Sequence, residues 1–112
     1  MHGSSEARDD WRVLRAQAQL IELAPLAILV REIGSGAILF WNAGAEEVYG
    51  WSKAEALGQV SHELLKTEFP QPLAEIEAIL AQQGRWTGEL AHRTRAGVHI
   101  IVESRWALAR DE

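Results

Sequence analysis

The stretch that decides the fold is Phe40-Trp41-Asn42-Ala43-Gly44-Ala45-Glu46-Glu47-Val48-Tyr49-Gly50-Trp51-Ser52-Lys53-Ala54-Glu55-Ala56-Leu57-Gly58. It reads as the end of a strand followed by two short helices. Asn42 can cap the first helix, because its side chain accepts hydrogen bonds from otherwise unpaired N–H groups. Gly50 suits the left-handed residue that closes that helix. Ser52 and Glu55 have the spacing of a capping box that opens the second helix, and Gly58 can end it.

Outside this stretch the chain alternates β-rich runs with turn signals. Gly34-Ser35-Gly36 separates the first two apolar runs and predicts a hairpin. Thr94-Arg95-Ala96-Gly97 predicts a second turn, and Pro72 to Gln83 reads as a longer helix. The pattern predicts four strands, near residues 26–33, 37–41, 86–95 and 98–109.

These motifs together resemble the PAS family of sensory and dimerisation modules in signalling proteins. The block from Trp41 to Ser52 is similar to the family pattern W-N-x-x-A-E-x-x-Y-G-W-S, and Gly84 to Arg93 is similar to G-x-W-x-G-E-x-x-x-R. The resemblance covers roughly residues 25–110. It implies an α+β fold, in which an antiparallel sheet of five strands carries short helices on one face.

One strand of that fold is missing from the sequence pattern. The resemblance places the fifth strand between the first and the fourth, and here it would begin near Asp111-Glu112. Without it, two apolar strands would expose unpaired backbone groups. Two readings stay open: the sequence is cut before this strand, or another segment or chain fills the slot.

Residues 8–24 read as a separate amphipathic helix ahead of a PAS domain at 25–112, and residues 1–7 read as a tail that is disordered or left over from cloning. An apolar stripe recurs at helical spacing, and Pro25 ends the helix. The stripe could cap its own domain or form a dimer contact. We expect a homodimer, because the resemblance implies that such helices and the outer sheet face associate. The residues expected at the contact are Trp11, Leu14, Ala18, Ile21 and Trp106.

Composition predicts one soluble, cytoplasmic domain. The 112 residues are 47% hydrophobic and 24% charged, which is usual for a globular protein. No apolar run approaches the roughly 20 residues that span a bilayer, so we expect no direct membrane contact. The net charge of −5 disfavours nucleic acid as a partner. Facing charges on the strands are expected to pair, for example Glu89 with an arginine.

The polar residues do not form an obvious metal or cofactor site. The four histidines lack metal-binding spacing, and His92 and His99 are expected to face solvent across the second turn. By the family resemblance, haem would need a histidine within Pro72–Gln83, and a flavin photoadduct would need a cysteine; both are absent. We therefore predict no cofactor and no metal, and leave open a non-covalent flavin or a small organic ligand. The candidate ligand-binding residues are Trp41, Tyr49, Trp51 and His62.

The chain does not have the pattern of an enzyme. Ser61, His62 and Glu63 are adjacent in sequence, which does not produce triad geometry. Glu46 and Glu47 read as helix-surface residues. We therefore predict no catalytic residues in this chain.

The sequence is interpreted as a PAS sensory or regulatory module of a multidomain signal-transduction protein. The resemblance suggests a bacterial sensor histidine kinase of a two-component system, whose effector domain lies outside this chain. The alternative is a ligand-free PAS domain that serves only dimerisation or protein–protein interaction. A stand-alone small enzyme is a remote third reading.

Overall fold

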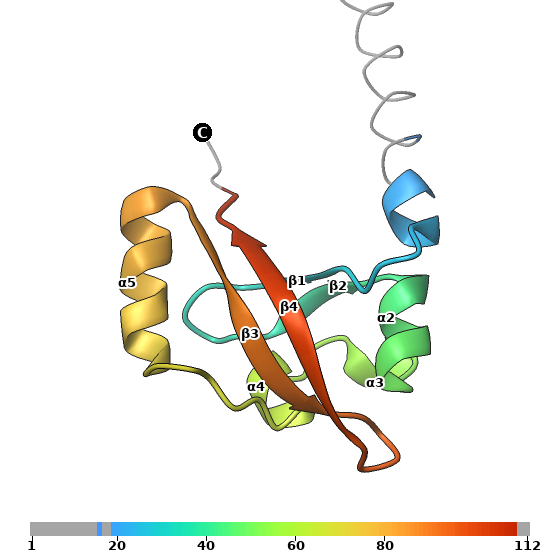
Figure 1. Ribbon diagram of the computed structural model, residues 1–112. Coiled ribbons are helices and arrows are strands. Elements are labelled where there is room, and N and C mark those ends of the chain that lie inside the picture. The colour runs from blue at the N-terminus through green and yellow to red at the C-terminus, as the bar shows by residue number, and fades with distance from the viewer. Residues whose placement is uncertain (1–15, 17–18, 110–112) are drawn as a thin grey trace, which may run out of the picture. The chain divides into compact units, whose positions relative to one another are not determined.

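A computed structural model describes residue 16 and residues 19–109 of the chain (Figure 1). The chain divides into two compact units, Met1–Ser61 and His62–Glu112. Each unit combines an antiparallel strand pair with short helices. This composition agrees with the α+β class expected from the sequence.

The first unit begins with a β-hairpin. Strand β1 (Leu29–Arg31) pairs with β2 (Ile38–Trp41), and Leu29 lies opposite Trp41. Gly34 and Gly36 in the connecting turn have φ of 92° and 75°, a conformation that side chains with a Cβ rarely adopt. The predicted hairpin is confirmed, although both strands are shorter than the apolar runs suggested.

The two capped helices follow as predicted. In α2 (Ala43–Tyr49) the Asn42 side chain accepts from the Ala45 N–H, and Gly50 closes the helix at φ 81°. In α3 (Lys53–Ala56) Ser52 and Glu55 form both halves of the capping box. Helix α3 ends slightly earlier than expected: Leu57 is its C-cap, and Gly58 follows at φ 84°.

The second unit is built on a long hairpin. Helices α4 (Ser61–Leu64) and α5 (Leu73–Gln83) precede β3 (Arg85–Arg93), which pairs with β4 (His99–Ala107). Figure 1 shows α5 standing beside β3. Helix α4 was not predicted from the sequence. Its single turn has too few residues to show an apolar period.

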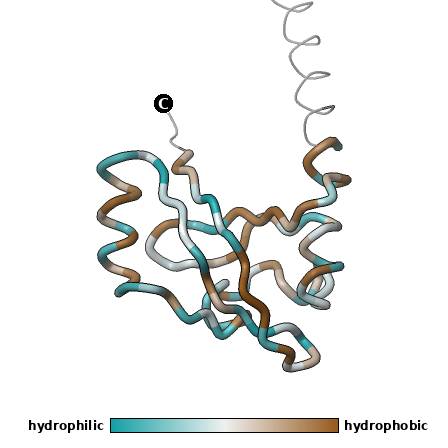
Figure 2. Tube along the Cα trace, viewed as in Figure 1, coloured by the Kyte–Doolittle hydropathy of each residue, from teal (hydrophilic) through white to brown (hydrophobic). Residues whose placement is uncertain are grey.

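One face of the long hairpin forms the core of this unit. Ile76 of α5 packs with Trp86 and Leu90 of β3, and the half-buried Trp106 of β4 packs against this cluster. Figure 2 shows a hydrophobic run in the half of β4 that follows the hairpin turn. Trp106 therefore lies on the α5 side of the hairpin. Its expected place on the outer sheet face was wrong.

The other face of the hairpin is exposed and carries facing acidic residues. Glu89 lies directly opposite Glu103 in the strand register, so it does not face an arginine as expected from the sequence. Alternation along β4 places Glu103 on this face, because residues 99, 101, 103, 105 and 107 are all exposed. Two like charges at opposite positions destabilise a strand pair.

The described residues contain four strands in two separate pairs. Within this part of the chain, β1 pairs only with β2, and β4 pairs only with β3. The count of four strands made from sequence is confirmed. Residues 19–23 are helical, as expected for the end of the N-terminal segment.

Candidate functional site

The side chain of Asn42 lies at the centre of the most connected polar site in the first unit. The residue is fully buried. Its Oδ1 accepts hydrogen bonds from the Ala45 N–H at 2.9 Å and the Ile28 N–H at 2.7 Å. Its Nδ2 donates to the carbonyl oxygens of Ile21 at 2.9 Å and Leu26 at 2.8 Å. One carboxamide thus joins the N-terminal helix, the start of β1 and the start of α2.

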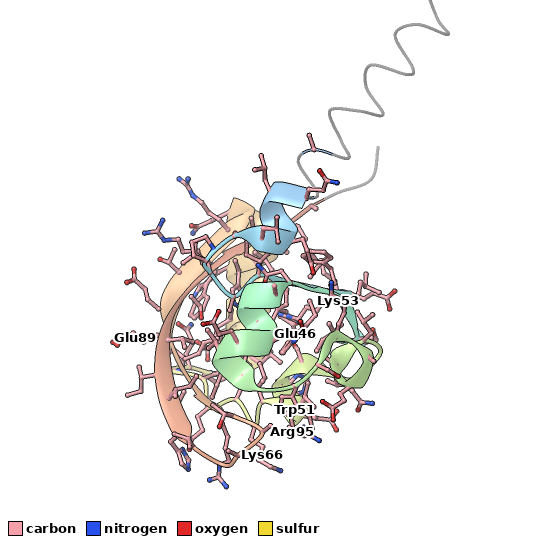
Figure 3. All side chains as sticks on the ribbon, turned by 90° about the vertical axis from the view of Figure 1, so that its right-hand side faces the viewer. Glu46, Trp51, Lys53, Lys66, Glu89 and Arg95 are labelled. Atoms are coloured by element: carbon pink, nitrogen blue, oxygen red, sulfur yellow. The ribbon has the colours of Figure 1, made fainter. Side chains whose placement is uncertain are left out.

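A second polar contact lies between α2 and α3. Glu46 of α2 accepts a hydrogen bond from the Lys53 N–H at 2.7 Å, and the Lys53 ammonium pairs with Glu22 of the N-terminal helix. Glu46 and Lys53 are labelled in Figure 3. Glu46 is half-buried, whereas the neighbouring Glu47 is exposed. Glu46 thus binds the backbone of Lys53, and Glu22 binds its side chain.

Three of the four predicted ligand residues come together in the first unit. Trp41 is fully buried, and its indole N–H donates to the Trp51 carbonyl at 3.0 Å. The ring of Tyr49 lies 5.5 Å from that of Trp41, and burial raises the pKa of the Tyr49 hydroxyl to about 12. Trp51 is half-buried. These contacts support the anchoring role that core aromatics have, and a role in ligand binding stays a prediction.

The fourth predicted ligand residue, His62, belongs to the second unit. Its ring lies 6.4 Å from that of Phe69. Its Nδ1 is buried and has no hydrogen-bond partner among the described residues. A buried polar atom without a partner costs free energy, so this nitrogen is a candidate to bind a polar ligand atom. That role also stays a prediction.

The two strand histidines occupy opposite faces of the long hairpin. His92 lies opposite Ile100 on the core face and is only 7% exposed. Burial lowers the pKa of its imidazole to about 4. His99 is exposed, and its Nε2 lies 2.6 Å from a guanidinium nitrogen of Arg93. The expectation that both histidines face solvent was wrong for His92, because the core face of β3 includes position 92.

A shallow groove lies on the second unit along β3. Its volume is about 230 Å³. Glu68 forms an antiparallel bridge with Ala91, which places the chain before α5 beside this strand. The groove is lined by Glu68, Phe69, Pro70, Glu89, Leu90, Ala91 and Ile101. It was not identified from the sequence, because a long-range bridge forms one side.

The described residues lack two features that would bear on function. Among them, no cluster of three or more histidine or acidic side chains has the arrangement of a metal site. None of their helices has the length and hydrophobicity needed to cross a membrane.

The predicted dimer-contact residues are only partly described. Trp11, Leu14 and Ala18 lie outside the described residues. Ile21 is 41% exposed, so it is available for a partner. Trp106 packs inside its own unit, against the cluster of α5 and β3.

A family model described as the PAS fold matches residues 17–112. The PAS domain of a protein from Colwellia psychrerythraea is 30% identical, with a TM-score of 0.76 over 89% of this chain and 85% of that one. The PAS domain of an HTR-like protein from Haloarcula marismortui is 21% identical, with a TM-score of 0.64 over 88% and 84%. An RNA-binding light-oxygen-voltage receptor is 19% identical, with a TM-score of 0.75 over 86% of this chain and only 28% of that one. No curated protein matches the sequence.

Proposed function

Because this chain belongs to the PAS family, as its match over residues 17–112 shows, we propose that it relays the state of a ligand or partner to an effector domain outside these residues. PAS domains are sensory modules, and the effector proposed here is a histidine kinase of a two-component system. The chain itself binds and transmits, and it performs no chemistry.

The observation that best supports a relay is the set of hydrogen bonds made by the Asn42 side chain. This buried side chain bonds to the carbonyl of Ile21, at the end of the N-terminal helix, and to the first turn of α2. A change in α2 would therefore reach the N-terminal helix. Hydrogen-bond networks are one physical route by which two elements are coupled.

We propose that the purified chain carries no stoichiometric cofactor. The chain has no cysteine, and the helix Leu73–Gln83 has no histidine. A non-covalent flavin or small organic ligand is the alternative, and His62 is the residue we expect to contact it. An absorbance spectrum together with native mass spectrometry separates these cases. A colourless protein at its sequence mass supports the proposal, whereas visible absorption or a stoichiometric mass increment contradicts it.

A second candidate function is dimerisation. Leu20, Ile21 and Leu23 are 72%, 41% and 76% exposed, which is a large apolar exposure for one helical turn. We propose that the N-terminal helix forms a homodimer contact. Analytical ultracentrifugation at micromolar concentration should show a dimer, and Ile21→Glu should weaken it. A monomer for the intact chain would refute this proposal.

The sequence that follows this domain in the parent gene tests which class of effector it controls. A following helix with a phosphoacceptor histidine would support the histidine kinase. Another effector motif there would contradict the kinase while leaving the relay proposal intact.

A further inference from the structure

The N-terminal helix is held to the first unit mainly by polar contacts. Its described residues bury little apolar surface, since Leu20 and Leu23 are about three-quarters exposed. Figure 2 shows this short helical segment as hydrophobic. Hydrophobic burial scales with the area removed from water, so it contributes little here.

We propose that the two polar atoms of the Asn42 side chain have separate roles, and we call this arrangement the Asn42 joint. The oxygen caps α2, and the nitrogen independently holds the N-terminal helix in place. The oxygen accepts hydrogen bonds from Ala45 of α2 and from Ile28, the residue directly before β1. The nitrogen donates to Ile21 of the N-terminal helix and to Leu26 in the segment between that helix and β1. The joint is therefore a positioning device whose two functions can be separated. This inference does not depend on the proposed function.

The chain between the helix and β1 lies directly on the start of α2. A Cβ added at Gly44 would lie 2.1 Å from the Leu26 carbonyl oxygen and 3.1 Å from that of Ala24. Both of these atoms are backbone, so neither can move without shifting the segment. Gly44 thus permits the close approach that brings the Leu26 carbonyl within reach of Asn42.

The ion pair of Lys53 and Glu22 is a weaker second fastening. Its side chains are 42% and 31% exposed. Partly exposed pairs contribute little to stability, because water and salt screen them. The two part-buried hydrogen bonds that the Asn42 nitrogen donates should therefore dominate.

One substitution removes the hydrogen bonds donated by the Asn42 nitrogen and keeps the oxygen that caps α2. Asn42→Asp keeps an oxygen that can cap α2, since aspartate is as good an N-cap as asparagine. It removes both donors, because an ionised carboxylate only accepts hydrogen bonds. The Ile21 and Leu26 carbonyls would then face a negative charge.

Amide hydrogen exchange of the intact chain tests the joint. In N42D at neutral pH, the backbone amides within residues 20–26 (Pro25 has none) should exchange about tenfold faster or more than in the unsubstituted chain, as expected for lost local hydrogen bonds. The amides of α2 that bond within the helix should keep their protection. At a pH low enough to protonate the new carboxyl, which then regains one donor, part of the protection at residues 20–26 should return.

Matched variants complete the test. Lys53→Met removes the ion pair alone and should change exchange at residues 20–26 by less than about fivefold. If N42D does not fold, Gly44→Ala decides, because it displaces residues 24–26 without touching Asn42 and should show the same local pattern. Unchanged protection of residues 20–26 in a folded N42D would overturn the inference. Equal loss of protection in α2 would also overturn it, since the two sides would not be separable.

Discussion

The rings of Trp86 and Trp106 pack edge to face across the long hairpin, with 5.1 Å between their centroids. They occupy directly opposite positions on β3 and β4. Phe69 extends the cluster, its ring lying 6.2 Å from that of Trp106. Aromatic pairs of this geometry contribute beyond the area they bury. The cluster therefore ties β4 to the core of the second unit.

Trp106→Ala should lower the free energy of unfolding by about 2 kcal/mol, because it removes a half-buried ring from this cluster. Trp86→Ala should cost more, about 3–5 kcal/mol, since Trp86 is only 7% exposed. Urea denaturation measures both variants. Unchanged stability of Trp106→Ala, accompanied by loss of self-association, would restore the interface role expected from sequence.

Gly88→Ala should destabilise the fold although alanine suits a strand better than glycine does. A Cβ at Gly88 would lie 2.5 Å from the Trp86 ring, which occupies the space above the glycine. We expect a loss of about 1–3 kcal/mol, the usual cost of overpacking. In a Trp86→Ala background the same substitution should be close to neutral. An equal cost in both backgrounds would show that a clash with the Trp86 ring is not the cause.

Glu103→Lys should stabilise the protein by about 0.5 kcal/mol, because it turns the facing Glu89–Glu103 pair into opposite charges. The gain should shrink in high salt, which screens exposed charges. Thermal unfolding at low and high ionic strength measures it. Glu103→Gln is the control, since it removes repulsion without adding attraction, and an equal gain from both would exclude an attractive pair.

Asn42→Ala should destabilise the fold by about 2–4 kcal/mol. The buried side chain that caps α2 also bonds to Ile28, Ile21 and Leu26. Each of these partners that is left buried and unpaired adds a penalty. The sequence alone predicts about 1 kcal/mol for loss of a helix cap. Chemical denaturation decides between the two values, and a loss near the smaller one would mean that water replaces the other bonds.

Stability should fall as the pH drops from about 6.5 to about 4, because of His92. Its pKa is 6.5 in the unfolded chain and about 4 when buried, so within this window the unfolded state binds more protons and stability rises with pH. The full effect is on the order of 3 kcal/mol. His92→Leu should remove most of this slope. A slope equal to that of the unsubstituted chain would assign the effect to other groups.

Local signals predicted the helical block well. Caps at Asn42, Gly50, Ser52 and Glu55 depend on residues within four positions of one another, so the sequence contains the whole interaction. The two hairpin turns were predicted for the same reason.

Long-range contacts could not be predicted in this way. The nitrogen of Asn42 bonds to Ile21, which is 21 positions away, and no periodicity points to that partner. Alternation along β4 places Trp106 on the same face as Val102, but only the packing of α5 shows that this is the inner face of the hairpin. The same information was needed to place His92 in the core.

Relay of the domain's state through the N-terminal helix is the central claim, and the effector output of the parent protein carrying N42D tests it most directly. Near-ultraviolet circular dichroism would first establish that the core is folded. We expect the output to differ at least about threefold from that of the unsubstituted parent, with Lys53→Met changing it less. An unchanged output in a folded N42D, whose N-terminal helix has been released according to hydrogen exchange, would contradict the claim.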